Sequence, residues 1–384
     1  MNNYLKNCFD FIYKVLLRYT IPVFYYLPIQ RNKVVFFRDW GLGYGCNMKY
    51  LAEYILNNNL PFELVWILNY YDNTIPDQIR QVKLSRIKCV YELSTAKVVV
   101  TSVKIKIPVK KKENQYFVYI PHGQAGAKPC LDEIPLKDDF RKMAMEHSAI
   151  QNLFVASSAF QAKDFIDFYW CRCDILRCGY PRNDIYFQDN TSLMIKTRNK
   201  LNIPKDYQVA FYAPTFRDNG KADAYSLDIN HVINVLEKKT EKRWLFLVRL
   251  HPNLRFWYDK PNIKYTSKVI DVTDYPDIQE LFLVSDIVIT DYSSTMFDFA
   301  LTHKPVFLFA TDVDDYIEMR GLKQLFFRTP FPLCRSNEEL EQAILAFVEE
   351  AYQQKLDVFY SEYQPYDDGH AAEHVVGKIL QQIQ

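Results

Sequence analysis

Short apolar runs alternate with amphipathic stretches along most of the chain. In the first half, Met48–Asn57 has helical spacing, and four apolar runs predict strands: Val34–Phe37, Phe62–Ile67, Lys97–Thr101 and Gln115–Ile120. The second half restarts the alternation, with helices at Ile229–Lys238 and Ile278–Val284 and strands at Val209–Ala213, Trp244–Leu250, Ile287–Thr290 and Val306–Phe309. Strands separated by helices form a parallel sheet that is covered on both faces. The pattern therefore predicts an α/β protein made of two similar halves.

The length of the chain supports the same division. At 384 residues, the chain exceeds what one ordinary hydrophobic core supports. Between the two halves, residues 186–207 are polar and include a charged helical stretch, so we predict a linker there. We accordingly predict a first domain over residues 31–185 and a second over residues 208–384, which ends in a helix at Ala371–Ile383.

Residues 2–19 carry a separate amphipathic pattern. Apolar residues such as Leu5, Phe9 and Ile12 recur at three- and four-residue spacing, which predicts a helix with one apolar face. Lys14 and Arg18 interrupt any apolar run long enough to span a bilayer. The helix therefore either lies in the membrane interface or docks on the first domain.

Charge and cysteine content narrow the class of protein. Lys and Arg together number 47 and Asp and Glu 46, a formal net charge of +1, which argues against a dedicated nucleic-acid binder. An anionic ligand must instead meet a local cluster of basic residues. The eight cysteines are scattered without paired CxxC spacing, which indicates ordinary thiols in a reducing cytosol.

The segment Asp286–Asp298 combines a buried strand with the start of a helix. Ser293, Ser294 and Thr295 are the candidate caps of that helix, and their hydroxyls lie beside its unpaired backbone N–H groups. Such an arrangement binds phosphate. Serine also caps many helices with no ligand, but ligands of open parallel sheets bind beyond the carboxyl ends of the strands, as here.

Four other strand ends carry groups that suit a diphosphate. Arg249 and His251 are two residues apart at one strand end, so their side chains point to the same side of the sheet. His122 ends a strand of the first half and precedes Gly123, which permits close backbone approach. Taken alone, each of these histidines would also fit a structural role. The last two strand ends contribute Arg182, Pro214 and Thr215.

Two further patterns carry weaker signals. The loop Gly41–Gly45 is rich in glycine but fits neither a dinucleotide-binding nor a Walker motif. Asp312 and Asp314 form a DxD pattern that could hold a metal ion, although a solvated helix start explains it equally well. We therefore predict no metal site.

Taken together, the motifs at 122–123, 179–184, 212–218, 249–252 and 271–300 resemble those of the CDP-glycerol glycerophosphotransferase family, over about residues 33–380. The resemblance implies a GT-B fold, in which two Rossmann-like domains face each other and the donor, CDP-glycerol or CDP-ribitol, lies against the second domain. It implies no metal and no cofactor.

The resemblance also implies roles for the motif residues. His122 would take the proton of the acceptor hydroxyl, while Arg249 and His251 would hold the diphosphate and stabilise the departing CMP. The other donor-binding residues would be Gly123, Gln124, Arg182, Pro214, Thr215, Ser293, Ser294, Thr295 and Asp298. Where the family commonly has WHGTPLK, this chain has Gln124 and a displaced Lys128, so the polyol and the acceptor stay open.

The implied activity is transfer of a polyol phosphate to a hydroxyl of a lipid-linked or growing polymeric acceptor, with release of CMP, in teichoic acid or capsule synthesis. Since such an acceptor sits at the cytoplasmic face of the membrane, we expect residues 1–30 to lie in the membrane interface. The alternative is a GT-B glycosyltransferase or epimerase that uses a nucleotide sugar.

Overall fold

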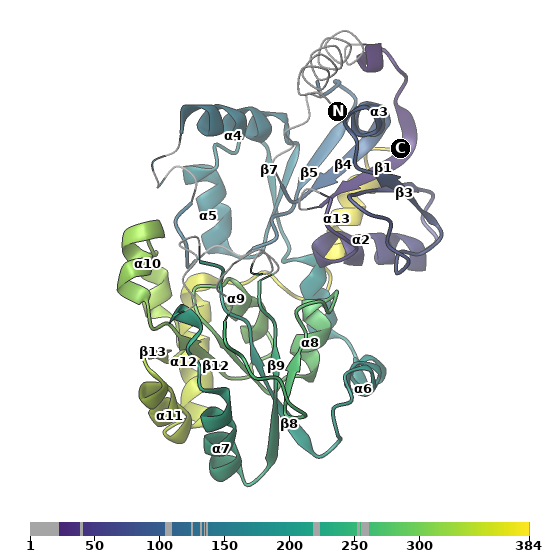
Figure 1. Cartoon of the computed structure of the whole chain (residues 1–384). Coiled ribbons are helices and arrows are strands. Elements are labelled where there is room, and N and C mark those ends of the chain that lie inside the picture. The colour runs from purple at the N-terminus through teal and green to yellow at the C-terminus, as the bar shows by residue number, and fades with distance from the viewer. Residues whose placement is uncertain are drawn as a thin grey trace, which may run out of the picture.

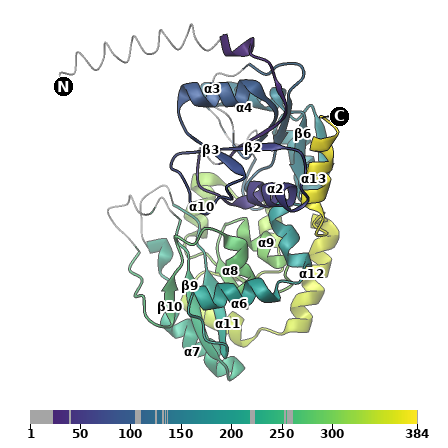
Figure 2. The same ribbon diagram turned by 90° about the vertical axis from the view of Figure 1, so that its right-hand side faces the viewer.

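The computed structural model describes residues 23–38, 41–103, 110–123, 126–130, 133, 135, 137–217, 223–251, 254 and 261–383. The amphipathic pattern at residues 2–19 and the predicted site residue Gln124 lie outside these ranges. Figure 1 shows two α/β domains one above the other, and Figure 2 gives the view at right angles. The described residues thus include both predicted domains.

The first domain is built on a seven-stranded parallel sheet with the order β3-β2-β1-β4-β5-β6-β7. Its strands are β1 (Gln30–Phe37), β2 (Glu63–Leu68), β3 (Ile79–Lys83), β4 (Ala96–Thr101), β5 (Tyr116–Tyr119), β6 (Leu153–Ala156) and β7 (Asp174–Arg177). Val34 and Phe36 pack toward α2 (Cys46–Asn57), whereas Val35 and Phe37 pack toward α3 (Arg86–Thr95). The central strand is apolar at successive positions because both faces of the sheet are covered.

The second domain repeats this design with a six-stranded parallel sheet in the order β10-β9-β8-β11-β12-β13. Its strands are β8 (Tyr207–Tyr212), β9 (Arg243–Val248), β10 (Val269–Asp271), β11 (Ile287–Thr290), β12 (Val306–Phe309) and β13 (Leu333–Cys334). One face packs on α8 (Ile278–Val284), α9 (Thr295–Ala300) and α12 (Glu349–Tyr363). The other face packs on α7 (Ile229–Thr240) and α11 (Asn337–Leu345).

The strand order reverses at an equivalent place in the two sheets, between β1 and β4 and between β8 and β11. Ligands of open parallel sheets bind beyond the carboxyl ends of the strands at such a point. Residues that follow β1, β5, β8, β9 and β11 line one cavity between the domains. The two Rossmann-like sheets therefore face each other, as the GT-B expectation requires.

Two segments differ from the predicted domain boundaries. The predicted linker contains α6 (Thr191–Lys200), and its Met194 packs against the core of the second domain. The C-terminal helix α13 (Ala371–Leu380) was expected in the second domain, but its Val375 and Ile379 lie in the core of the first. Figure 2 shows the chain rising from α12 to α13 in the upper domain. Composition identified these helices but gave no information about which core they join.

The position of α13 makes the first domain depend on the end of the chain. Ile379 is fully buried, so Ile379→Ala should reduce the free energy of unfolding by about 2–5 kcal/mol. Hydrogen exchange should show lost protection first in α2, which packs beside α13, and not in α7. The exposed neighbour His374→Ala serves as the control. Loss of protection in α7 before α2 would contradict this assignment.

Candidate active site

A cavity of about 580 Å³ lies between the facing strand ends. Ten of the predicted site residues line it: His122, Arg182, Pro214, Thr215, Arg249, His251, Ser293, Ser294, Thr295 and Asp298. Gly123 lines the adjoining cavity, beside Ser294. The structure thus brings together the described residues that the strand-end motifs singled out, although they are up to 176 positions apart in the chain, from His122 to Asp298.

The cavity is rich in positive charge. Besides Arg249, its wall includes Arg38, Lys128 and Arg320, which the motifs did not place in the site. The carboxylate of Asp277 is paired with Lys49 at 2.6 Å, and that of Asp298 with Arg182 at 2.7 Å. Because both carboxylates are neutralised by partners, the net field favours an anion such as a diphosphate.

Arg249 follows β9 and is held against the second domain. Its Nη1 donates a hydrogen bond of 2.8 Å to the backbone carbonyl of Tyr275. Burial lowers the pKa of Arg249 to about 10; nearby Asp277 opposes this shift and Arg38 adds to it. The guanidinium is still charged at neutral pH, and its incomplete solvation makes a bound anion a favourable partner.

The two predicted histidines approach the cavity from different domains. The ring of His251 lies against that of Phe216, with centroids 5.2 Å apart. Burial lowers the pKa of His251, and the positive charges of Lys128, His122 and Arg320 lower it further. His251 is therefore neutral near pH 7. The influence of His122 on His251 also indicates that the two imidazoles share one electrostatic environment.

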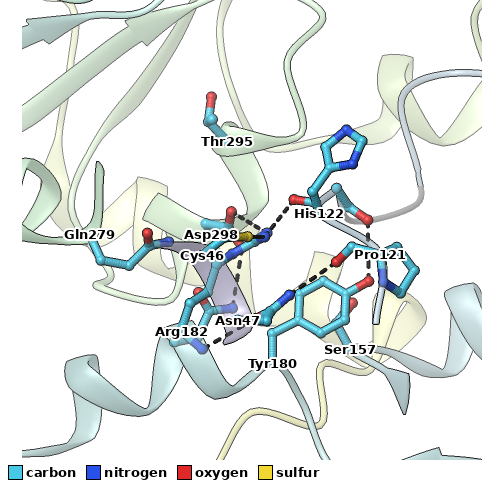
Figure 3. A network of polar contacts seen from close by, with 12 residues as sticks. Cys46, Asn47, Pro121, His122, Ser157, Tyr180, Arg182, Gln279, Thr295 and Asp298 are labelled. Carbon is cyan, nitrogen blue, oxygen red and sulfur yellow. Dashed lines mark hydrogen bonds and ion pairs between the residues drawn. The ribbon is translucent and has the colours of Figure 1, made fainter. Parts of the chain in front are cut away.

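Arg182 connects three other segments of the chain, and it is only 3% exposed. Figure 3 shows the carbonyl of His122 turned toward the guanidinium, while the imidazole points away. The same guanidinium donates to Asp298 Oδ2 at 2.7 Å and to Cys46 Sγ at 3.2 Å. The backbone N–H of Arg182 donates to Asn47, whose amide in turn donates to the carbonyl of Pro121. Arg182 thereby links the loop that carries His122 to α9 of the other domain.

The predicted phosphate loop is the turn in Asp286–Asp298 that carries Ser293 and Ser294. One hydroxyl of this loop makes no hydrogen bond to the start of α9. Ser294 occupies the N-cap of α9, but its side chain makes no capping hydrogen bond. Ser293 accepts hydrogen bonds from the N–H and the hydroxyl of Thr295 at 3.4 and 2.9 Å. Ser294 Oγ lies 3.1 Å from where a Cβ of residue 123 would stand, so a larger residue than glycine there would displace the Ser294 side chain slightly. The loops of the two domains meet closely here.

Arg217 fixes the floor of the second half of the site, a role that the sequence did not reveal. Its guanidinium pairs with Asp291 at 2.8 Å and with Asp312 at 2.6 Å, and it lies over the ring of Tyr292. Asp291 also accepts from the backbone N–H of Thr215 at 2.8 Å. Asp312, the first residue of the DxD pattern, is therefore engaged in an ion pair with Arg217. Within the described ranges, no group of three His, Cys, Asp or Glu residues is placed to hold a metal ion.

Gln279 lies within the motif at 271–300, but no role was predicted for it. It lies in the first turn of α8, lines the cavity and is fully buried. The Tyr186 hydroxyl lies close to the Gln279 amide. Among the described residues, however, neither Nε2 nor Oε1 of Gln279 makes a well-aligned hydrogen bond. A buried amide without such partners is costly, so its place in the wall suits a polar ligand.

The family follows from a comparison of the whole sequence. Residues 19–381 match the sequence profile of the family described as CDP-Glycerol:Poly(glycerophosphate) glycerophosphotransferase. The chain belongs to this family. The match confirms the resemblance in the strand-end motifs, and it places the cavity in a glycerophosphotransferase fold.

Individual relatives of this glycerophosphotransferase family member support the same family assignment. The chain is 27% identical over 397 residues to the teichoic acid glycerol-phosphate transferase of Staphylococcus aureus, covering 98% of this chain and 100% of the relative. It is 26% identical over 375 residues to the teichoic acid poly(glycerol phosphate) polymerase of Bacillus spizizenii, covering 92% and 93%. The solved structure of the wall teichoic acid polymerase TagF matches with a TM-score of 0.84 at 25% identity, over 99% of this chain and 98% of that chain.

The match to the TagF structure confirms the predicted GT-B fold.

Some curated relatives are longer, and the chain spans about half of their length, 51% and 49% in two cases. Among the described residues, no helix has the length and apolar character that crossing a bilayer requires.

The pKa of His251 provides a test of the charged cavity. Histidine titration followed by NMR should give a midpoint for His251 below 6.5, the ordinary value. Since Lys128 holds this pKa down, Lys128→Gln should move the midpoint upward. His231, which faces Glu341 on the second domain, is the internal control. A midpoint at or above 6.5 in the unaltered protein would contradict the described environment.

Proposed function

We propose that this protein transfers glycerol phosphate, or another polyol phosphate, from a CDP-polyol to a hydroxyl of a lipid-linked or growing polymeric acceptor, with release of CMP. The process served is teichoic acid or capsule synthesis. The observation that carries the proposal is the cation-lined cavity between facing strand ends, with a histidine from each domain. Family membership and the named relatives support the same donor class.

The donor lies in this cavity against the second domain. Arg249 and His251 hold the diphosphate from one side, and Ser293, Ser294 and Thr295 hold it from the other. Pro214 and Thr215 line the pocket, and the Thr215 hydroxyl has no hydrogen-bond partner among the described residues. Gln279 offers an amide to the cytosine or the polyol.

The chemical step is a displacement at the β-phosphorus of the donor. The acceptor oxygen forms a bond to this phosphorus, and the bond from phosphorus to the bridging oxygen breaks, so that CMP leaves with the electron pair. His122 takes the proton of the attacking hydroxyl and later releases it to solvent. Arg249 stabilises the charge that develops on CMP. Because side chains supply the positive charge, the step requires no metal and no cofactor.

Arg182 and Asp298 act through position in this scheme. The family resemblance implied that both residues bind the donor. In the structure their charges are paired with each other, and the second oxygen of Asp298 accepts from Asn183 at 3.2 Å. We therefore assign them the task of holding the His122 loop in register with the phosphate loop.

The acceptor places the enzyme at a membrane. We propose that it works peripherally at the cytoplasmic face, with residues 1–30 in the interface. The support is the amphipathic pattern of residues 2–19 and the lipid on which such an acceptor is carried.

The nucleotide released distinguishes this proposal from its rival. Incubation with CDP-glycerol, CDP-ribitol and UDP-sugars, together with a polyol-phosphate acceptor, should release CMP from a CDP-polyol only. A glycosyltransferase or an epimerase would instead release UDP or alter the sugar. His122→Ala and His251→Ala should each reduce the rate of CMP release by about 100- to 10,000-fold, because each removes a group that acts in the transition state.

The same substitutions should leave the fold intact. Both histidines reach solvent at the mouth of the cavity, although the cavity walls partly desolvate the His251 ring, and neither belongs to a hydrophobic core, so the Tm should change by no more than about 2 °C. His374→Ala, an exposed histidine on α13, should retain full activity. Full activity in the double variant His122→Ala, His251→Ala would refute the assigned roles.

A further inference from the structure

A smaller cavity, of about 220 Å³, adjoins the donor cavity on the side of the first domain. His122, Lys128 and Ser294 line both cavities. The remaining wall comes mainly from the end of β5, residues 127–130, and α5 (Ala159–Phe168). The predicted base therefore stands at the boundary between two spaces, and the donor accounts for only one of them.

The wall of this smaller cavity contains the buried carboxylate of Asp164, one oxygen of which could accept a hydrogen bond from a ligand. Asp164 is 4% exposed, and its Oδ1 accepts from Lys323 Nζ at 2.8 Å. Lys323 comes from the second domain and also pairs with Glu133 at 2.9 Å. Among the described residues, Asp164 Oδ2 has no hydrogen-bond partner, although the thiol of Cys130, a weak donor, interacts with the carboxylate. A buried carboxylate oxygen in this condition suits a hydroxyl donor from a ligand.

Two neighbouring groups complete the chemistry. Tyr169, the residue that ends α5, also lines the cavity, and it lies in the electrostatic environment of Asp164 and Cys130. Lys128 brings positive charge to the boundary with the donor cavity. The cavity thus offers a hydrogen-bond acceptor and a hydroxyl for the alcohol groups of a ligand, and a cation for its phosphate.

The volume matches a small polyol phosphate. At about 220 Å³, the cavity exceeds by far the roughly 10–15 Å³ that one water molecule needs, so it has room for a small ligand. Glycerol phosphate, with about ten non-hydrogen atoms, occupies a comparable space.

We propose that this cavity, with Asp164 and Tyr169 in its wall, binds the terminal polyol phosphate unit of the acceptor and presents the free hydroxyl of that unit to His122. The inference rests on the proposed function, since it supplies the second substrate of the same reaction. It makes Asp164 and Tyr169 acceptor-binding residues, separate from the residues that hold the donor. It also gives Lys323 a positioning role, because this lysine orients the carboxylate of Asp164.

Direct binding tests the inference without turnover. Glycerol 3-phosphate and ribitol 5-phosphate are titrated into the full chain by calorimetry, with saturating CDP in the donor cavity. At least one of them should bind, and the pair distinguishes which polyol the cavity accepts. Asp164→Asn should weaken this binding by about tenfold or more, and Tyr169→Phe by about three- to tenfold. Tyr265→Phe, at an exposed tyrosine outside the cavity, should have no effect.

Steady-state kinetics adds a second measurement. Asp164→Asn and Tyr169→Phe should raise KM for the acceptor and leave KM for the CDP-polyol unchanged. Unchanged CDP affinity in both variants shows that they fold. The inference is overturned if neither polyol phosphate binds, which would leave a cavity filled by water only, or if binding is insensitive to both substitutions. Failure of the proposed function would appear differently, as no CMP release from any CDP-polyol by the unaltered protein.

Discussion

The ion pair between Arg182 and Asp298 is the interaction on which the site depends most. Both side chains are 4% exposed, and the pair joins the loop of His122 to the helix that follows the phosphate loop. Removing two charges from water is costly, and only close pairing with further hydrogen bonds offsets this cost. Loss of one partner would leave an uncompensated buried charge, at a cost of about 3–5 kcal/mol. The alignment of the two half-sites is therefore fixed by the same contact that stabilises the interface.

Two further ion pairs tie the domains together around this contact. Lys49 of the first domain meets Asp277 at 2.6 Å, and Lys323 of the second meets Asp164 at 2.8 Å. Within the second domain, Arg217 holds the loops after β8 and β11 in place. Each of these interdomain ion pairs has a carboxylate in a cavity wall, Asp277 in the donor cavity and Asp164 in the smaller one. The cavities therefore lie where ion pairs connect the two domains. The domains are also connected by the chain itself, because α13 follows the second domain and packs in the core of the first.

Much of the fold follows from the sequence because parallel strands buried on both faces leave continuous apolar runs. The predicted strand Ile287–Thr290 has the bounds of β11, and the predicted helix Ile278–Val284 has those of α8. The polar residues after such runs must gather at one edge of a sheet, which is why Arg249 and His122 could be identified without coordinates.

The remaining features depend on tertiary contacts that no local pattern encodes. Arg38 follows the apolar run of β1 but belongs to no motif, and Arg320 and Gln279 are ordinary helical positions by sequence. The pairing of Arg182 with Asp298 joins residues 116 positions apart. Asp164 likewise looks like a solvated residue of an amphipathic helix until Lys323 of the other domain is seen against it.

Substitution of Arg182 by lysine is the measurement that tests the account most directly. Lysine keeps the charge opposite Asp298 but cannot reach His122, Cys46 and Asp298 together. With the exposed Arg243→Lys as control, Arg182→Lys should reduce kcat for CMP release by about 100-fold, while Kd for CDP-glycerol changes less than about threefold. An unchanged kcat, or a loss of donor affinity that accounts for the whole defect, would contradict the account.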